Sequence, residues 1–298
     1  MSFDLVIVGA GIVGASTAWQ MQQRHPQLRI LLLEKESAPG QHQTGRSSGV
    51  IHAGVYYEPG SMKAQFCLAG REATLAFCRE HAIPYSQCGK LLVATNELEL
   101  GRMAKLAERC AGNGIDFETW DQRRLCDAEP AITGLGAIHV PATGSVSFQA
   151  ICRRMLEKFI TLGGAVRFNT AVSRLQERAD SVEVQAGSET IATAFLLTCA
   201  GLQSDRLARQ QGLATDHRII PFRGEFFALA PEKRNLVQRH IYPIPDPALP
   251  FVGIHLTRMI DGGVSIGPNA VLALAREGYH KPAFSLRDCA GTLAFPGF

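Results

Sequence analysis

The first apolar run of the chain is short and continuous, and a glycine-rich turn follows it directly. Leu5-Val6-Ile7-Val8 has no polar interruption, which is typical of a strand buried on both faces of a parallel sheet. Apolar positions recur with helical spacing from Ala15 to Arg24, and a second apolar strand is predicted from Arg29 to Leu33. Strand, glycine turn, helix and strand together predict a βαβ unit.

Further along the chain, helical and strand patterns alternate before a different pattern begins. Helices are predicted over 62–81, 97–111 and 148–162, and strands over 91–95, 137–140, 165–169, 182–185, 190–192 and 195–199. From Pro221 to Gly267, apolar and polar residues alternate among prolines, which favours an antiparallel sheet. We therefore predict a mixed α/β fold in which a Rossmann-like nucleotide-binding domain (1–83 and 145–215) is interleaved with an antiparallel-sheet substrate domain (84–144 and 216–298).

Composition and charge narrow the class of protein. The 298 residues are 46% hydrophobic and 19% charged, as in folded globular chains. Lys and Arg (30) nearly balance Asp and Glu (27) and are scattered along the sequence, which speaks against a nucleic-acid partner. The chain has no basic leader and no apolar stretch of ~18 residues, so we expect a cytoplasmic location. Eight cysteines without CxxC spacing indicate reduced, buried thiols and no metal site.

The glycine-rich turn has the spacing of a dinucleotide-binding motif. Gly9 would permit the tight turn, Gly11 would let the backbone approach a pyrophosphate, and Gly14 would let the helix pack on the strand. Glu34 and Lys35 end the second strand and are candidates for cofactor contacts. Glu34 would accept hydrogen bonds from the ribose hydroxyls, which disfavours NADP; the alternative is a solvated carboxylate at a strand end. This motif alone leaves NAD and FAD open.

The loop from Gln41 to Tyr57, with the sequence QHQTGRSSGVIHAGVYY, resembles the flavin loop of FAD-dependent oxidoreductases related to D-amino-acid oxidase. More narrowly, it is similar to the L-2-hydroxyglutarate dehydrogenase/oxidase branch. The resemblance continues through PGSMKA (59–64), CGKL (88–91), ITGLG (132–136), PFRGEF (221–226), IYPIPDP (241–247), GIHLTR (253–258) and GPNA (267–270). It therefore covers essentially the whole chain.

This resemblance implies FAD as the cofactor and oxidation of a 2-hydroxy acid, most specifically L-2-hydroxyglutarate to 2-oxoglutarate. It implies pyrophosphate or flavin contacts from Ser47, Ser48 and Gly49, adenine contact from the backbone of Val172, and a second glycine contact from Ala200 and Gly201. Members of the family continue beyond the position of Phe298. We therefore expect a truncated member in which the C-terminal part of the FAD-binding domain is absent.

The expected reaction needs a base, because the substrate hydroxyl must lose a proton while C2 gives hydride to flavin N5. Histidine suits this step because its ordinary pKa of ~6.5 lies near the working pH. Alternation within the predicted strand turns His255 inward with Gly253 and Thr257, and the resemblance favours it as the base. His52, in the flavin loop, is the alternative base, a substrate ligand or a flavin neighbour.

A dicarboxylate substrate needs cationic ligands, and guanidinium groups bind carboxylates with two parallel hydrogen bonds. The candidates are Arg223 and Arg258, whose alternative role is as surface charges or partners of Glu225 and Asp261. Tyr57 and Tyr242 are candidates for hydroxyl donors to the substrate, or else packing aromatics.

Further partners and other functions stay open from the sequence. Electrons would pass to oxygen or a quinone, and a peripheral contact of the chain with the inner membrane is left open. One alternative is a truncated, inactive nucleotide-binding chain. Another is an amino-acid or amine oxidase of the same superfamily.

Overall fold

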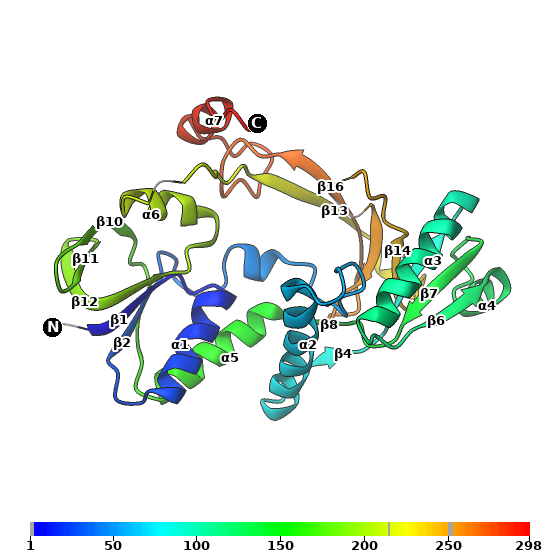
Figure 1. Ribbon diagram of the computed structural model, residues 1–298, viewed down its shortest axis with the longest axis horizontal. Helices are drawn as coiled ribbons and strands as arrows, with labels where there is room; N and C mark the ends of the chain where they lie inside the picture. The colour runs from blue at the N-terminus through cyan, green and yellow to red at the C-terminus, as the bar shows by residue number, and fades with distance from the viewer. Residues whose placement is uncertain (1–2, 214, 250–252) are drawn as a thin grey trace. The chain divides into compact units, whose positions relative to one another are not determined.

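The computed structural model describes residues 3–213, 215–249 and 253–298. The chain forms two compact units, each assembled from segments that are separated in the sequence (Figure 1). The first unit contains residues 1–47, 148–223 and 272–298, and the second contains 48–147 and 224–271. Both parallel and antiparallel strands are present, so the predicted mixed α/β class is confirmed.

A six-stranded sheet forms the centre of the first unit, in the order β10-β11-β12-β1-β2-β9. Its strands are β1 (Phe3–Val8), β2 (Ile30–Leu33), β9 (Ala165–Arg167), β10 (Val172–Glu177), β11 (Val182–Ala186) and β12 (Glu189–Thr198). β12, β1, β2 and β9 run parallel to one another, whereas β10, β11 and β12 form an antiparallel meander.

Both faces of this sheet are covered, which explains the uninterrupted apolar runs. On one face, Ile7 and Leu32 pack with residues of α1 (Ile12–Arg24) and α5 (Phe148–Thr161), two helices that lie side by side (Figure 1). On the other face, Val6 and Leu31 pack with the meander and with α6 (Ser204–Gln210). Alternate residues of each central strand therefore enter different cores.

Three features of the first unit differ from the sequence prediction. Residues 48–83, which the sequence prediction placed in the first domain, belong to the second unit. The segments 190–192 and 195–199 belong to one strand, β12, because the strand changes partners instead of ending: Thr193 pairs with both β11 and β1. The segment 272–298, which carries α7 (Leu286–Leu293), belongs to the first unit. Its Arg276 forms an ion pair with Asp205, which holds this segment to α6 of the first unit.

The second unit contains a seven-stranded sheet, β13-β16-β15-β14-β5-β7-β6, and a small sheet, β3-β8-β4. The larger sheet has β5 (Lys90–Ala94), β6 (Glu118–Asp121), β7 (Gly136–Val140), β13 (Phe222–Ala228), β14 (His240–Pro243), β15 (His255–Arg258) and β16 (Val264–Leu272). The smaller has β3 (Val50–Ile51), β4 (Tyr85–Ser86) and β8 (Gly144–Val146), and the helices are α2 (Met62–Glu80), α3 (Glu97–Gly112) and α4 (Gln122–Ala128). The short 3-10 helices of the chain are η1 (Gln43–Arg46), η2 (Gly201–Gln203) and η3 (Pro231–Lys233).

In the larger sheet of the second unit, β6, β7 and β5 pair antiparallel, and so do β14, β15 and β16, whereas β14 runs parallel to β5. A purely antiparallel sheet was the expectation from alternation, and this pair corrects it. The chain leaves the second unit after residue 147 and returns at residue 224, so no hairpin joins β5 to β14. Without a hairpin, nothing forces the two strands to pair in antiparallel direction. The register of this pair sets Lys90 opposite His240.

Candidate functional site

The turn after β1 depends on two glycines that the protein's own backbone requires. Gly9 has a φ of +104°, and a Cβ there would lie 2.4 Å from the carbonyl oxygen of Cys199. A Cβ on Gly14 would lie 1.8 Å from the carbonyl oxygen of Gly9. These contacts let β12 and the first turn of α1 approach the end of β1 closely.

Gly11 is different, because nothing in the protein's packing requires a glycine there. It precedes α1 with an ordinary extended conformation (φ −72°, ψ 177°). A Cβ would contact Thr44 Oγ1 at 3.4 Å and no other atom within 4 Å in the described chain. The first turn of α1 carries no acidic side chain. An open space at the positive end of a helix fits a diphosphate, so the residues present fit a dinucleotide cofactor.

Glu34 and Lys35 lie beside this turn with several partners each. Glu34 is only 8% exposed, so it is not a solvated carboxylate at a strand end. Its Oε2 accepts a hydrogen bond from the Ala10 N–H at 2.7 Å, and Oε1 accepts one from the Glu36 N–H at 2.9 Å. Glu34 is thus held against the glycine turn, where the motif predicts the ribose ligand.

Lys35 occupies the centre of a cluster that otherwise resembles a metal site. Ligand atoms of Glu36, His42 and Glu277 lie within 4.8 Å of one another. Lys35 Nζ lies 2.6 Å from Glu36 Oε1, 2.9 Å from His42 Nε2 and 2.9 Å from Glu277 Oε2. Burial opposes its charge, but hydrogen bonds to Glu36 and Glu277 outweigh this effect and raise the pKa of Lys35. The ammonium supplies the positive charge that a metal would bring.

The second predicted glycine contact also lies at this turn. The Gly9 position faces Cys199 and Ala200, and Gly201, with a φ of +50°, lies beside Gln43. Val172 opens β10 and is packed, half-buried, against one core of the unit. The structure therefore brings Ala200 and Gly201 together with the glycine motif.

The serine loop is divided between the units. Ser47, in the first unit, is exposed and its hydroxyl donates to the Thr44 carbonyl at 3.3 Å. Ser48 is half-buried and Gly49 is buried in the second unit. Gly49 has a φ of +70°, and a Cβ there would lie 2.5 Å from the Val146 carbonyl oxygen. Its glycine is therefore explained by the pairing of β3 with β8.

The loop before and within η1 contributes residues that sequence reasoning missed. Thr44 Oγ1 accepts a hydrogen bond from the Ile12 N–H at 3.0 Å, and the Gly40 N–H donates to the Ala10 carbonyl at 3.1 Å. This loop has no hydrophobic period, so its fold could not be predicted from pattern. The only available signal was the family-like sequence that includes Gln43 and Thr44.

In the second unit, a lysine, a tyrosine and a histidine form a stack. The Tyr242 and His255 rings are nearly parallel, with centroids 3.9 Å apart and an interplanar angle of 19°. Lys90 Nζ lies 4.1 Å from the Tyr242 ring centroid. Lys90 is 1% exposed, and within the described residues it forms no ion pair or hydrogen bond through its ammonium group. Burial lowers the pKa of Lys90 to about 7.

His255 is oriented by one hydrogen bond. Its Nδ1 lies 2.9 Å from the Gly253 carbonyl oxygen. A carbonyl only accepts, so Nδ1 carries the proton and the neutral ring presents an unprotonated Nε2. Burial lowers the pKa of His255, the Gly253 contact opposes this, and the Lys90 charge lowers it further. His255 opens β15 and is 8% exposed, consistent with the predicted inward direction.

His240, expected to be a surface or structural residue, is fully buried in the same region. Its Nδ1 accepts a hydrogen bond from the Arg258 N–H at 3.3 Å, and its Nε2 lies 3.4 Å from Ser145 Oγ. Burial, followed by the Lys90 charge, lowers the pKa of His240 to about 4. Both ring nitrogens are engaged, so His240 has a structural role.

His52 belongs to the same electrostatic group, although its side chain is exposed. Surrounding protein atoms, and then Lys90, His240 and His255, lower the pKa of His52. Nearby, the hydroxyl of Tyr56 is buried with no hydrogen-bond partner in the described chain. The Tyr56 ring centroid lies 5.4 Å from Lys90 Nζ. This part of the second unit therefore contains an ammonium group, neutral imidazoles and an unsatisfied hydroxyl.

The two arginines predicted to bind substrate donate hydrogen bonds to main-chain carbonyls. Arg258 donates to the Val237 carbonyl and, at 3.4 Å, to the Arg234 carbonyl. Arg223, in the first unit, donates to the Gly278 and His280 carbonyls at 3.2 and 3.3 Å. Tyr57 is half-buried, and its carbonyl accepts from Asn113 Nδ2 at 2.8 Å. Among the described residues, none of these contacts joins Arg223, Arg258 or Tyr57 to the stack of Lys90, Tyr242 and His255.

The chain matches the family model described as FAD dependent oxidoreductase over residues 4–294. The chain belongs to this family. L-2-hydroxyglutarate dehydrogenase of Escherichia coli (strain K12) is 53% identical over 297 residues, covering 99% of this chain and 70% of that protein. L-2-hydroxyglutarate dehydrogenase of Indibacter alkaliphilus is 42% identical over 302 residues, and the match covers 100% of this chain and 75% of that protein. The predicted family resemblance and the FAD cofactor are confirmed.

Solved structures agree on the fold. L-alpha-glycerophosphate oxidase from Mycoplasma pneumoniae with FAD bound has a TM-score of 0.84 at 21% identity, covering 93% of this chain and 73% of that chain. Glycine oxidase from Geobacillus kaustophilus has a TM-score of 0.79 at 20% identity, covering 91% and 72%. At these identities the likeness concerns the fold alone.

Proposed function

We propose that the chain oxidises L-2-hydroxyglutarate to 2-oxoglutarate. The observation that carries this proposal is the 53% identity, over 99% of the chain, to the L-2-hydroxyglutarate dehydrogenase of E. coli. When bound, FAD supplies an acceptor for the hydride on C2 of the substrate. The chain must then bind the cofactor, hold a dicarboxylate and remove one proton from its hydroxyl.

Residues of the first unit hold the cofactor in this proposal. Gly9 and Gly14 shape the turn, and the open face of Gly11 receives the pyrophosphate at the start of α1. Glu34 receives the ribose hydroxyls on the lone pairs that its two backbone hydrogen bonds leave free. Further cofactor contacts are proposed for Lys35, Ser47, Ser48, Gly49, Val172, Ala200 and Gly201.

His255 is the proposed base. Its lone pair on Nε2 accepts the hydroxyl proton, because Nδ1–H is committed to the Gly253 carbonyl. A lowered pKa keeps the imidazole neutral near pH 7, the form that a base requires. Stacking on Tyr242 fixes the plane of the ring. His52, with a similarly lowered pKa, is the second candidate for contact with substrate or flavin.

Lys90 is the proposed carboxylate ligand, in preference to Arg223 and Arg258. A buried cation is costly without an anionic partner, and none of the ion pairs among the described residues involves Lys90. A substrate carboxylate would supply that partner. The guanidinium groups of Arg223 and Arg258 are already bound to main-chain carbonyls. The unsatisfied hydroxyl of Tyr56 and the hydroxyls of Tyr57 and Tyr242 are further candidate ligands.

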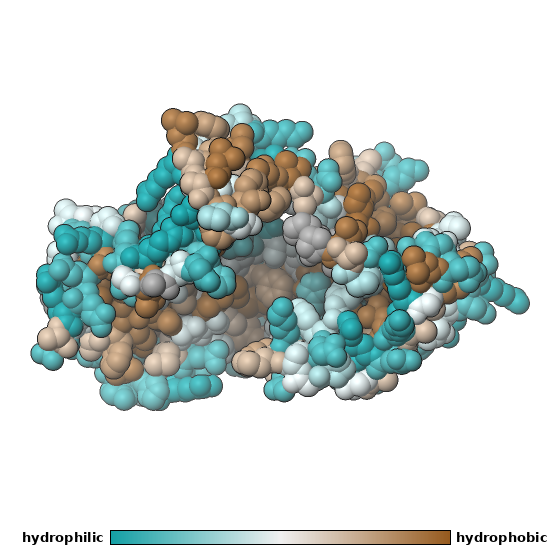
Figure 2. Space-filling view, turned by 45° about the horizontal axis from the view of Figure 1, so that its top comes forward, coloured by the Kyte–Doolittle hydropathy of each residue, from teal (hydrophilic) through white to brown (hydrophobic). Residues whose placement is uncertain are grey.

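Oxygen or a quinone is the proposed electron acceptor, and a quinone would bring the chain to a membrane surface. No helix in the described ranges is both long and apolar enough to span a bilayer. Hydrophobic side chains are nevertheless exposed on the face in Figure 2. On α7, Leu286 and Leu293 are 76% and 77% exposed. Reduced sedimentation of a Leu286→Ser, Leu293→Ser variant with phospholipid vesicles would support a peripheral contact there, whereas no sedimentation of the parent chain would exclude it.

The reaction is tested by anaerobic reduction of the FAD-loaded chain. L-2-hydroxyglutarate should bleach the visible flavin absorbance and yield 2-oxoglutarate, while the D enantiomer should not. Glycine, proline and glycerol 3-phosphate serve as competing substrates, because enzymes of the same fold act on compounds of these kinds. Faster reduction by any of them would reject the proposed substrate. Flavin that is bound but reduced by none of these compounds would reject the proposed activity.

A further inference from the structure

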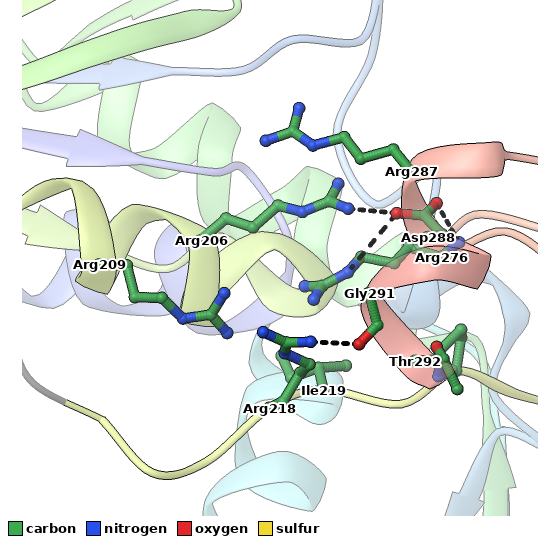
Figure 3. Close-up of a pocket in the computed structure, with 10 residues that line it drawn as sticks. Arg206, Arg209, Arg218, Ile219, Arg276, Arg287, Asp288, Gly291 and Thr292 are labelled. Atoms are coloured by element: carbon green, nitrogen blue, oxygen red, sulfur yellow. Dashed lines mark hydrogen bonds and ion pairs between the residues drawn. The ribbon is translucent and has the colours of Figure 1, made fainter. Parts of the chain in front are cut away.

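A small cavity of about 130 Å³ in the first unit is surrounded by arginines (Figure 3). Segments far apart in the sequence supply them. Its cationic lining consists of Arg206 and Arg209 from α6, Arg218, Arg276, and Arg287 from α7. Charges that are scattered along the sequence are therefore concentrated at one place in the fold.

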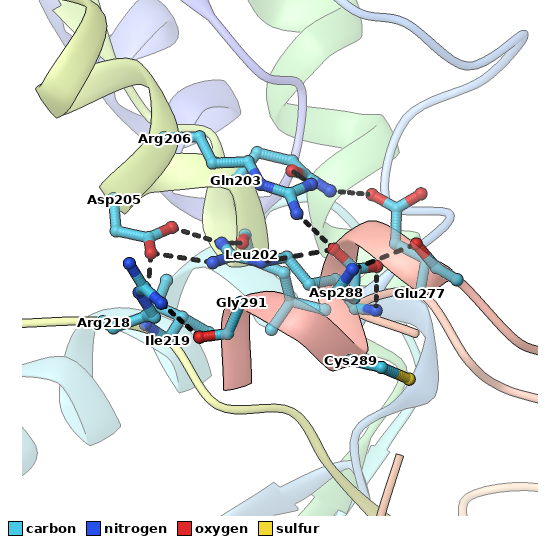
Figure 4. Close-up of polar contacts among 12 residues, drawn as sticks. Leu202, Gln203, Asp205, Arg206, Arg218, Ile219, Glu277, Asp288, Cys289 and Gly291 are labelled. Atoms are coloured by element: carbon cyan, nitrogen blue, oxygen red, sulfur yellow. Dashed lines mark hydrogen bonds and ion pairs between the residues drawn. The ribbon is translucent and has the colours of Figure 1, made fainter. Parts of the chain in front are cut away.

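The two aspartates that pair with these arginines are Asp288, which lines the cavity, and Asp205, and both are already engaged (Figure 4). Asp205 accepts hydrogen bonds from Arg276 Nη2 at 2.8 Å and from Arg209 Nη2 at 2.7 Å. Burial raises the pKa of Asp205, but the Arg276 contacts and the Ile219 N–H outweigh it and bring the pKa to about 2. Asp288 accepts from Arg206 and, at 2.9 Å, from the Arg276 N–H.

Five guanidinium groups thus face two carboxylates, a surplus of three positive charges. Arg218 donates to the Gly291 carbonyl, which carries no charge. Arg287 forms no hydrogen bond or ion pair with the residues the structure describes. Like charges held this close repel one another unless an anion lies between them. The buried ion pair of Arg276, 7% exposed, with Asp205 joins the 272–298 segment to α6 beside the cavity.

We propose that this cavity binds a small multivalent oxyanion, of phosphate or dicarboxylate type, through residues that the proposed reaction does not use. Guanidinium groups present forked N–H donors that match such oxygens. The volume is well below the roughly 300–1,000 Å³ of pockets for drug-sized ligands, so it suits one phosphate or one short dicarboxylate. The site lies in the first unit, whereas Lys90 and His255 lie in the second.

The test measures anion binding to the FAD-saturated chain by calorimetry at constant ionic strength. Inorganic phosphate, sulfate and 2-oxoglutarate are compared with chloride. An Arg218→Gln, Arg287→Gln variant should bind the preferred anion at least tenfold more weakly. Arg287 is exposed and Arg218 half-buried, and urea unfolding checks that the variant remains folded. Arg174→Gln, an exposed arginine of β10 outside the cavity, is the matched control and should bind as the parent does.

The outcomes separate the ligand sources. Tight binding of phosphate and sulfate identifies a tetrahedral anion, whereas tight binding of 2-oxoglutarate that is weakened by the double variant identifies a dicarboxylate. If 2-oxoglutarate binding is unaffected by the double variant, it belongs to another site. The proposal is overturned if no anion exceeds chloride, or if Arg174→Gln weakens binding as much as the double variant.

Discussion

At the scale of single residues, Lys90 has two opposing electrostatic effects. Its positive charge attracts a carboxylate, and the same charge lowers the pKa of His255, His240 and His52. Substrate binding therefore needs Lys90 protonated, below its pKa of about 7, while proton removal needs His255 neutral, above its lowered pKa. Both requirements are met between the lowered pKa of His255 and about pH 7, and the lowered pKa of Lys90 sets the upper limit of this range.

The first prediction concerns the pH dependence that follows. In the parent chain, kcat/KM should rise with pH through the lowered pKa of His255 and fall above about pH 7 as Lys90 loses its proton. Lys90→Met should raise KM by roughly 10–100-fold, as expected for a lost charge-assisted hydrogen bond, and should abolish the alkaline decline. Lys105→Met, on exposed helix surface, is the control. An unchanged KM in Lys90→Met would reject the lysine as a substrate ligand.

The second prediction distinguishes two glycines of one motif. Gly11→Val should fold with a free energy of unfolding within about 1 kcal/mol of the parent, because the position is open, yet it should bind little FAD. Gly14→Ala should destabilise by roughly 1–3 kcal/mol or more, since its Cβ meets the Gly9 carbonyl at 1.8 Å. Urea unfolding without FAD and flavin content after purification provide the two measurements. Full flavin content in Gly11→Val would remove its assigned role.

The third prediction concerns the base. His255→Ala should lower turnover by ~10²–10⁴-fold, the usual contribution of general-base catalysis, while the flavin spectrum stays nearly unchanged. His52→Ala should disturb flavin binding as well, because it belongs to the flavin-like loop. If His255→Ala loses flavin but keeps its rate per bound flavin, and His52→Ala does the reverse, the two roles are exchanged. If neither changes turnover, the base is another residue.

At this scale, the sequence predicts contacts between residues that are close along the chain better than contacts between distant ones. Gly9, Gly14 and Glu34 belong to a local motif whose spacing determines their neighbours, and the structure places them at one turn. Lys90 lies in an apolar strand pattern, 152 residues from Tyr242 and 165 from His255. No local pattern reveals that strand pairing brings these residues together, so Lys90 was missed.

At the scale of elements, segments with one clear hydrophobic period were correctly predicted as strands or helices. The sequence pattern does not show where a strand exchanges one neighbouring strand for another. The continuous apolar runs of β1 and β2 predicted a sheet covered on both faces, and both faces are covered. The parallel pair β5 and β14 has no sequence signal, because pairing direction depends on the route of the chain between them. The attachment of 272–298 to α6 depends on ion pairs between distant segments.

The fourth prediction tests that attachment. Asp205 has a pKa of about 2 in the folded chain, below its ordinary 3.8, so its stabilisation is present above pH 3.8 and is lost as the pH falls through about 2. Asp205→Asn should therefore lower the free energy of unfolding by about 2 kcal/mol at pH 7. The difference between parent and variant should disappear near pH 2. Urea unfolding at several pH values measures it, and Asp180→Asn, in an exposed turn, should show no such effect.

At the scale of the whole molecule, the proposed chemistry is divided between the units. The first unit carries the residues that fit the dinucleotide, and the second carries Lys90, Tyr242 and His255. If FAD binds only to residues of the folded first unit, it should raise the free energy of unfolding of that unit. The two tryptophans of the chain allow this to be measured, because Trp19 lies in α1 of the first unit and Trp120 in β6 of the second.

The fifth prediction uses these two residues as separate reporters. In Trp120→Phe, the fluorescence of Trp19 reports unfolding of the first unit, and FAD at ~100 times its dissociation constant should stabilise that transition by about 2.7 kcal/mol. In Trp19→Phe, Trp120 reports the second unit, and its transition should shift less, because the glycine turn that fits the dinucleotide belongs to the other unit. AMP, which carries only the adenosine half and one phosphate, is the control ligand and should act on the Trp19 transition alone. Equal shifts of both reporters with AMP would contradict separate units, since a ligand of the first unit would then stabilise the second to the same extent.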